Sequence, residues 1–138
     1  MDKFVSPNNF RLWAYSLSHS QLLIRSGRNE KDSDSSNVDL IFGGVFYIEL
    51  KSIIFKGIEI TTVTPGQLDS IRIRRGLTRG HRWDKEGNYQ DDKNNYYVLC
   101  SGSRRHFIGA TSMHVKENKV DWALSSLDFP GSLLLKGE

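Results

Sequence analysis

The sequence predicts a mainly β protein, an α+β fold in which an antiparallel barrel or sandwich is accompanied by one short helix near 65–75. About nine short runs of apolar, β-branched or aromatic residues alternate with turn residues along the chain. One segment alone carries helix signals. Because parallel strands require helical crossovers, a single helix favours antiparallel pairing. A chain of 138 residues suits one domain, which we place at 1–138.

The first two runs predict a hairpin. FRLWAYSL (10–17) and QLLIRS (21–26) are separated by the short Ser-His-Ser segment at 18–20. The polar stretch RNEKDSDSSN (28–37) follows without any periodicity, and we expect a loop there.

The next two runs predict a second hairpin. NVDLIF (37–42) and VFYIEL (45–50) are separated by Gly43-Gly44, and two glycines tolerate the positive φ angles of a type I′ turn. In the second run Phe46, Ile48 and Leu50 alternate with polar residues, which predicts a buried face. The run IEITTV after Gly57 repeats this alternation.

The sequence pattern changes at Thr64 from the alternation of a strand to the signals of a helix. This threonine, a proline at 65 and Gln67 form the pattern of an N-cap, a first helical residue and a capping box. Gly76 suits the left-handed position after a helix. These signals predict the helix, whereas β-branched residues in IRIRR (71–75) leave a strand as the competing interpretation.

The last third of the chain predicts further strands. A polar loop is expected at 85–95, and Pro130-Gly131 ends the regular structure before a leucine-rich tail at 133–135 that must dock or find a partner. The expected strands are YYVLC (96–100), RHFIGA (105–110), SMHV (112–115) and VDWAL (120–124), the last two joined as a hairpin through 117–119.

Composition indicates a soluble cytoplasmic protein. Apolar residues make up 38% of the chain, which is enough for one core. The start resembles no secretory signal, and no run approaches the roughly 18 apolar residues of a membrane span, so we expect no membrane association. The single cysteine, Cys100, excludes an intramolecular disulfide and fits a reducing compartment.

Charge is distributed unevenly, although the net charge is only +3. Residues 29–39 hold four acidic side chains and one lysine, whereas residues 70–84 hold five arginines and one aspartate. Such lobes of opposite sign favour contacts with charged partners.

Familiar metal-site patterns are missing. The Ser/Asp stretch that begins at Asp32 has Asn37 and Gly43 where a calcium loop requires glycine and glutamate. The four histidines and Cys100 show no closely spaced ligand pair, although His106 and His114 could approach across strands. We therefore predict no metal and no cofactor.

The sequence also lacks familiar catalytic motifs. No nucleophile elbow or phosphate-binding loop motif occurs, and Cys100 lies within an apolar run, where we expect a small buried core residue. Glu49 and Glu59 lie on strands expected to be adjacent, and we interpret them as a solvated face partnered by Lys51 and Lys56.

The stretches FRLWAYSLSHSQLLIRS, NVDLIFGGVFYIEL and FKGIEI resemble a group of small bacterial single-domain proteins of unknown function. Those proteins open with a Tyr-x-x-Ser-His-x-x-Leu-Leu-Ile-Arg-Ser pattern. The resemblance implies no activity. It marks a shared opening in which only His19 and Arg25 lack an explanation as strand residues: Ser18, His19, Leu22, Leu23, Ile24, Arg25 and Ser26.

Three functional hypotheses follow. The first is a binding module that acts through a protein partner, for example as an immunity protein, with homo-oligomerisation as one form. The second is nucleic-acid or phosphate binding through the arginine-rich 72–83 segment, and the third and least supported is an enzyme that uses His19 or Cys100.

The arginines of the basic segment divide into two groups. Those within the predicted helix, at 72, 74 and 75, suit the negative end of its dipole and need no ligand. The predicted partner- or anion-binding residues are Arg79, Arg82, Trp83, His19 and Arg25.

Overall fold

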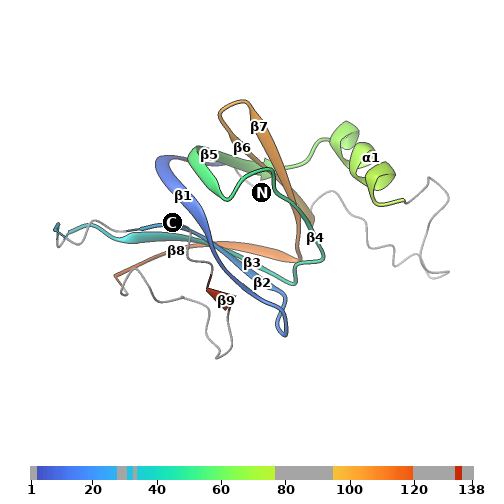
Figure 1. Ribbon diagram of the computed structural model, residues 1–138. Helices are drawn as coiled ribbons and strands as arrows, with labels where there is room; N and C mark the ends of the chain where they lie inside the picture. The colour runs from blue at the N-terminus through green and yellow to red at the C-terminus, as the bar shows by residue number, and fades with distance from the viewer. Residues whose placement is uncertain (1–2, 28–30, 33, 77–94, 120–132, 135–138) are drawn as a thin grey trace.

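The computed structural model describes residues 3–27, 31–32, 34–76, 95–119 and 133–134. Within these residues one short helix accompanies an extensive antiparallel sheet (Figure 1). The elements are β1 (Phe4–Ser16), β2 (Gln21–Ser26), β3 (Asn37–Gly43), β4 (Tyr47–Glu49), β5 (Ile54–Thr62), α1 (Pro65–Arg74), β6 (Tyr96–Ser101), β7 (Arg104–Gly109), β8 (Ser112–Asn118) and β9 (Leu133–Leu134).

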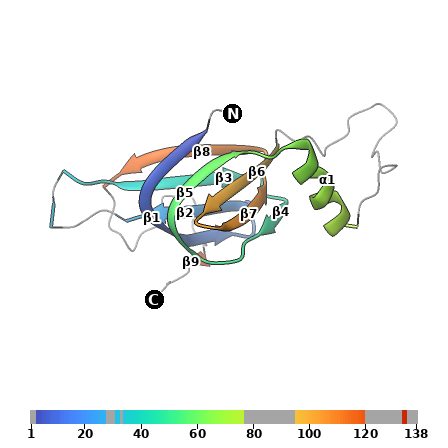
Figure 2. The same cartoon turned by 90° about the horizontal axis from the view of Figure 1, so that it is seen from above.

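The strands belong to one sheet in the order β4-β7-β6-β5-β1-β2-β3-β8, with β9 paired to β1 off this path. The sheet curls around an interior, as the view from above shows (Figure 2). It is not closed into a barrel, because the hydrogen-bonded path ends at β4 and β8. The mainly β, antiparallel prediction with one helix is thus confirmed, and the barrel alternative is wrong.

The predicted first hairpin is confirmed. β1 and β2 pair antiparallel, with Tyr15 opposite Leu22 and Ser16 opposite Gln21. β1 is longer than predicted because its first half pairs with β5 around a bulge, where Gly57 adopts a φ of 70°. That positive angle is accessible to glycine at little cost, which allows the proline-containing segment of β1 to pass.

The predicted Gly43-Gly44 hairpin is wrong. β3 pairs with β2 and β8, whereas β4 pairs with β7, so the chain bends at these glycines without reversing. A type I′ turn requires positive φ at both central residues, and only Gly44 has it. A Cβ on Gly44 would lie 2.2 Å from Thr111 Oγ1, so the glycine is needed for close approach to the bend between β7 and β8.

The interior of the curl holds the main core. Its buried members come from most strands of the sheet: Phe10, Leu22, Ile24, Leu40, Phe42, Val45, Phe55, Ile58, Ile60, Tyr97, Leu99, Ile108 and Ala110. The alternation predicted after Gly57 is confirmed for Ile58 and Ile60. The buried face predicted for 45–50 is wrong, because β4 lies at the sheet edge and leaves Phe46 and Ile48 exposed.

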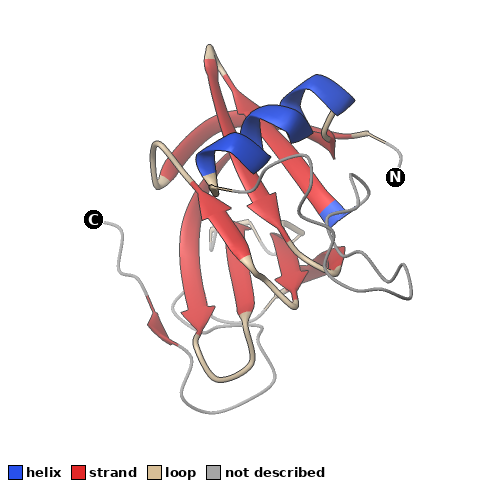
Figure 3. Cartoon of the chain, turned by 90° about the vertical axis from the view of Figure 1, so that its right-hand side faces the viewer, coloured by secondary structure: helices blue, strands red, loops and turns tan. Residues whose placement is uncertain are grey.

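The helix prediction is confirmed in detail. Thr64 Oγ1 accepts from the backbone N–H of Gln67, whose side chain accepts from the Thr64 N–H, so both halves of the capping box form. Leu68 and Ile71 pack on a second cluster with residues of β6 and β7, and α1 lies over this part of the sheet (Figure 3). Arg74 Nε donates to Glu49 at 2.8 Å, which ties the helix to β4.

The later strands agree in part with expectation. β6 and β7 form the predicted hairpin through Gly102, and Leu133 and Leu134 of the leucine-rich tail pair with β1 as β9. The turn predicted at 117–119 is wrong at its start, because β8 continues to Asn118 in order to pair with β3. The strand predicted at 120–124 and most of the loop at 85–95 lie outside the described residues. In the described part of the chain no helix is long and apolar enough to cross a membrane.

Candidate ligand-binding site

The residues predicted to contact a partner are distributed over distant parts of the chain. Arg79, Arg82 and Trp83 lie outside the described residues. His19 is exposed at the tip of the β1–β2 hairpin, where its Nδ1 lies 3.0 Å from Ser18 Oγ. The structure does not bring His19 together with Arg25, which lies in the last part of β2.

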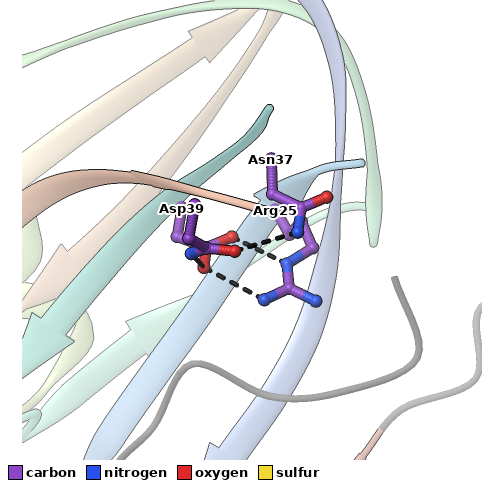
Figure 4. Close-up of polar contacts among 4 residues, drawn as sticks. Arg25, Asn37 and Asp39 are labelled. Carbon is purple, nitrogen blue, oxygen red and sulfur yellow. Dashed lines mark hydrogen bonds and ion pairs between the residues drawn. The ribbon is translucent and has the colours of Figure 1, made fainter. Parts of the chain in front are cut away.

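Arg25 is fully buried and forms an ion pair with Asp39, its register partner on β3. Its Nε donates to Asp39 Oδ1 at 2.7 Å and its Nη2 to Oδ2 at 3.0 Å, a bidentate geometry (Figure 4). Both side chains have 0% exposure. Removing two charges from water is costly, and this paired arrangement with further hydrogen bonds compensates the cost.

Neighbouring side chains complete the hydrogen bonding of this pair. Asn118 Nδ2 on β8 donates to Asp39 Oδ2 at 2.8 Å, and Asn118 Oδ1 accepts from Asn37 Nδ2 at 2.9 Å. The Arg25 guanidinium also lies 5.5 Å from the centre of the Trp13 ring. The cluster therefore joins β1, β2, β3 and β8, and Arg25 has a structural role that the sequence did not reveal.

A first pocket of about 490 Å³ opens beside Arg25. Arg11 and Lys56 contribute further cationic side chains to its lining. The complete lining is Asn9, Phe10, Arg11, Trp13, Arg25, Gly27, Ile54 and Lys56.

A second pocket of about 480 Å³ adjoins the first, because Ile54 and Lys56 line both. Its other lining residues come from the β6–β7 hairpin and from the segment before β5: Ser52, Ser101, Gly102, Ser103, Arg104 and His106. Arg104 Nη1 donates to the Lys51 carbonyl at 3.2 Å, which positions the guanidinium beside the pocket. The exposed Ile54 stands where the two pockets meet.

His106 is the buried polar group of the second pocket, with 1% exposure. Its Nδ1 accepts from the backbone N–H of Lys51 at 2.9 Å, so the neutral ring carries its proton on Nε2. That Nε2 has no hydrogen-bond partner among the described residues. Burial lowers the pKa of His106, and the nearby Lys51 and Arg104 charges lower it further, which keeps the ring neutral.

The two pockets share one electrostatic character. Arg11, Lys56 and Arg104 supply positive charge, and no aspartate or glutamate is among the described residues that line either pocket. Arg25 is already neutralised by Asp39. Serine hydroxyls and the His106 donor add polar groups, so the lining suits an anion.

Two sequence expectations about chemistry are corrected. Cys100 is half-buried and packs at the margin of the helix cluster, so it is not the fully buried residue that was expected. Glu49 and Glu59 lie on strands that do not pair with each other, and they contact Arg74 and Lys3 respectively.

The histidine pair considered for a metal also lies apart. His106 is opposite Leu99 on β6, whereas His114 is opposite Ile41 on β3. In the part of the chain that the structure describes, no group of His, Cys, Asp and Glu could hold a metal ion.

Sequence reasoning missed the two pockets. The signal was present in SGSRRH, where residues 104 and 106 share a strand face beside a Ser-Gly-Ser turn, but the partner segment from β5 is remote in sequence. No protein-family model, curated protein or solved structure matches this chain, so its function is argued from these residues.

Proposed function

We propose that this protein is a binding module that holds an acidic segment of a protein partner across the two adjoining pockets. The observation that carries the proposal is the lining itself, which combines Arg11, Lys56 and Arg104 with no acidic residue. The exposed Ile54 between the pockets offers an apolar contact for the same segment. Toxin neutralisation by an immunity protein is one form that such a function takes.

Nucleic acid is the competing ligand because its phosphates would suit the same charges. Binding of single strands also relies on exposed aromatic faces on which bases stack. The described lining offers Phe10, which is buried, and Trp13, which is half-buried and lies against Arg25. The pockets therefore fit carboxylates of a protein better than stacked bases.

The test is the affinity of the protein for a labelled hexaglutamate peptide, measured by fluorescence anisotropy. Lys56→Glu/Arg104→Glu should weaken binding about tenfold or more, since both charges line the second pocket. The matched control is Arg105→Glu/Lys116→Glu, which makes the same change in net charge at exposed residues outside both pockets.

Equal losses in the two double variants would contradict the proposal, because binding would then follow net charge alone. Tighter binding of a single-stranded DNA of matched charge would favour the nucleic-acid alternative instead. Light scattering of the unliganded protein should report a monomer. A dimer that the Lys56→Glu/Arg104→Glu change dissociates would show that the pockets hold a second copy, which is not the partner proposed.

A further inference from the structure

The Nε2 donor of His106 has no acceptor although it is buried. A buried donor without a partner costs roughly 1–3 kcal/mol, so few persist in folded proteins without a reason. His106 lines a cavity of about 480 Å³, although its Nε2 itself has almost no surface accessible to solvent. An acceptor that reaches this nitrogen through the second pocket would satisfy it.

The Lys51 backbone determines what His106 can offer. Because the Lys51 N–H donates to Nδ1, a proton on that nitrogen would break the contact, and the ring presents a neutral N–H at Nε2. A nitrogen that carries a proton has no free lone pair with which to bind a metal ion, and the neutral ring adds no net charge to the pocket. Its preferred partner is an oxygen with negative charge.

The surrounding groups define the class of that oxygen. Arg104 supplies a planar guanidinium beside the pocket, and Lys56 supplies a second positive charge. Ser52 Oγ is already engaged with the backbone of Ile54, both as donor at 2.9 Å and as acceptor at 3.1 Å. The residues that line the second pocket thus supply one neutral imidazole N–H, two cationic side chains and the hydroxyls of Ser101 and Ser103 as donors.

We propose that the second pocket is a carboxylate subsite in which His106 Nε2–H donates a hydrogen bond to one oxygen, with Arg104 and Lys56 balancing the charge. This inference rests on the proposed function and specifies it. An aspartate or glutamate side chain of the bound acidic segment fills the subsite. The imidazole N–H donates a hydrogen bond that positions the carboxylate, whereas the two cations attract its negative charge.

Two substitutions separate the two nitrogens of His106. In His106→Asn the short amide lies at the place of Nδ1, where its oxygen still accepts from the Lys51 N–H, and the Nε2 donor is lost. In His106→Gln the longer amide places a donor near Nε2 and the Lys51 contact is lost. Hexaglutamate affinity should fall about tenfold or more in His106→Asn, and His106→Gln should retain most of it.

A second measurement needs no variant. Acetate titrated into the ¹⁵N-labelled wild-type protein should move the His106 Nε2–H proton resonance downfield, and sodium chloride at matched ionic strength should leave it in place. This readout keeps the subsite testable even where a His106 variant fails to fold. An equal shift with chloride, or no shift with acetate, would overturn the carboxylate subsite.

The outcomes distinguish the two proposals. Unchanged peptide affinity in His106→Asn beside a loss in Lys56→Glu/Arg104→Glu would overturn the subsite and support the proposed function. If acetate shifts the His106 Nε2–H resonance of the wild-type protein but the protein binds no hexaglutamate, the second pocket is a site for small carboxylates. That result would support the subsite and contradict the acidic segment as the partner.

Discussion

The Arg25–Asp39 cluster and His106 are two buried polar regions of one sheet, and they differ in how far their hydrogen bonds are satisfied. Arg25 meets both oxygens of Asp39, and two asparagines extend the network. His106 has one nitrogen occupied and the other without a partner in the described part of the chain. A complete network stabilises the fold, whereas the buried donor left open at His106 is where we propose that a ligand binds.

The largest effect is expected at Asp39. Asp39→Ala should lower the free energy of unfolding by about 3–5 kcal/mol, because it leaves the Arg25 charge buried without its counter-ion. Urea unfolding followed by circular dichroism measures the change.

The control for Asp39→Ala replaces both charges at once. Arg25→Met/Asp39→Leu should recover most of the lost stability, since apolar side chains of similar volume carry no desolvation cost. A loss below about 1 kcal/mol in Asp39→Ala would contradict the structural role assigned to the pair.

A smaller effect is expected where the network is extended. Asn118→Ala should cost about 1–3 kcal/mol, because it removes a donor to Asp39 Oδ2 and the acceptor for Asn37 Nδ2. Lys116→Ala, on the same strand and exposed, is the control and should stay within about 0.5 kcal/mol of wild type. Equal values for the two variants would mean that β8 needs no buried hydrogen bond.

The smallest stability change is expected at His106, and it depends on pH. The pKa of His106 is lowered in the folded protein, so the unfolded chain takes up the proton first as the pH falls below about 6.5. The His106 contribution to stability is therefore fully present above that pH and is lost progressively toward the lower folded pKa.

His106→Asn should reduce this pH dependence. Urea midpoints measured between about pH 8 and about pH 5 should decline less steeply in the variant than in wild type, because the titrating ring is gone. Parallel slopes in the two proteins would show that His106 does not titrate differently on folding.

Local sequence signals predicted the elements whose causes are local. The helix follows from Thr64, Pro65 and Gln67, and the first hairpin from two apolar runs about a short turn. The Gly43-Gly44 pair misled the prediction because two glycines serve a hairpin turn and a close-packed bend equally well. Which applies depends on Thr111, a residue distant in sequence.

The candidate site was less predictable for the same reason. Arg25 stood out in the sequence, but its partner Asp39 is identified only by the β2–β3 register. The second pocket requires Lys56 from β5 and His106 from β7, two strands that do not pair directly. The Ser-Gly-Ser turn before Arg104 marks one side of this pocket in the sequence, but no residue near Lys56 marks the other side.

A crystal structure of the protein with hexaglutamate tests the central claim most directly. The account predicts a glutamate carboxylate in the second pocket, with one oxygen about 2.7–3.2 Å from His106 Nε2 and Arg104 beside it. A peptide bound elsewhere on the surface, with only water at His106 Nε2, would contradict it.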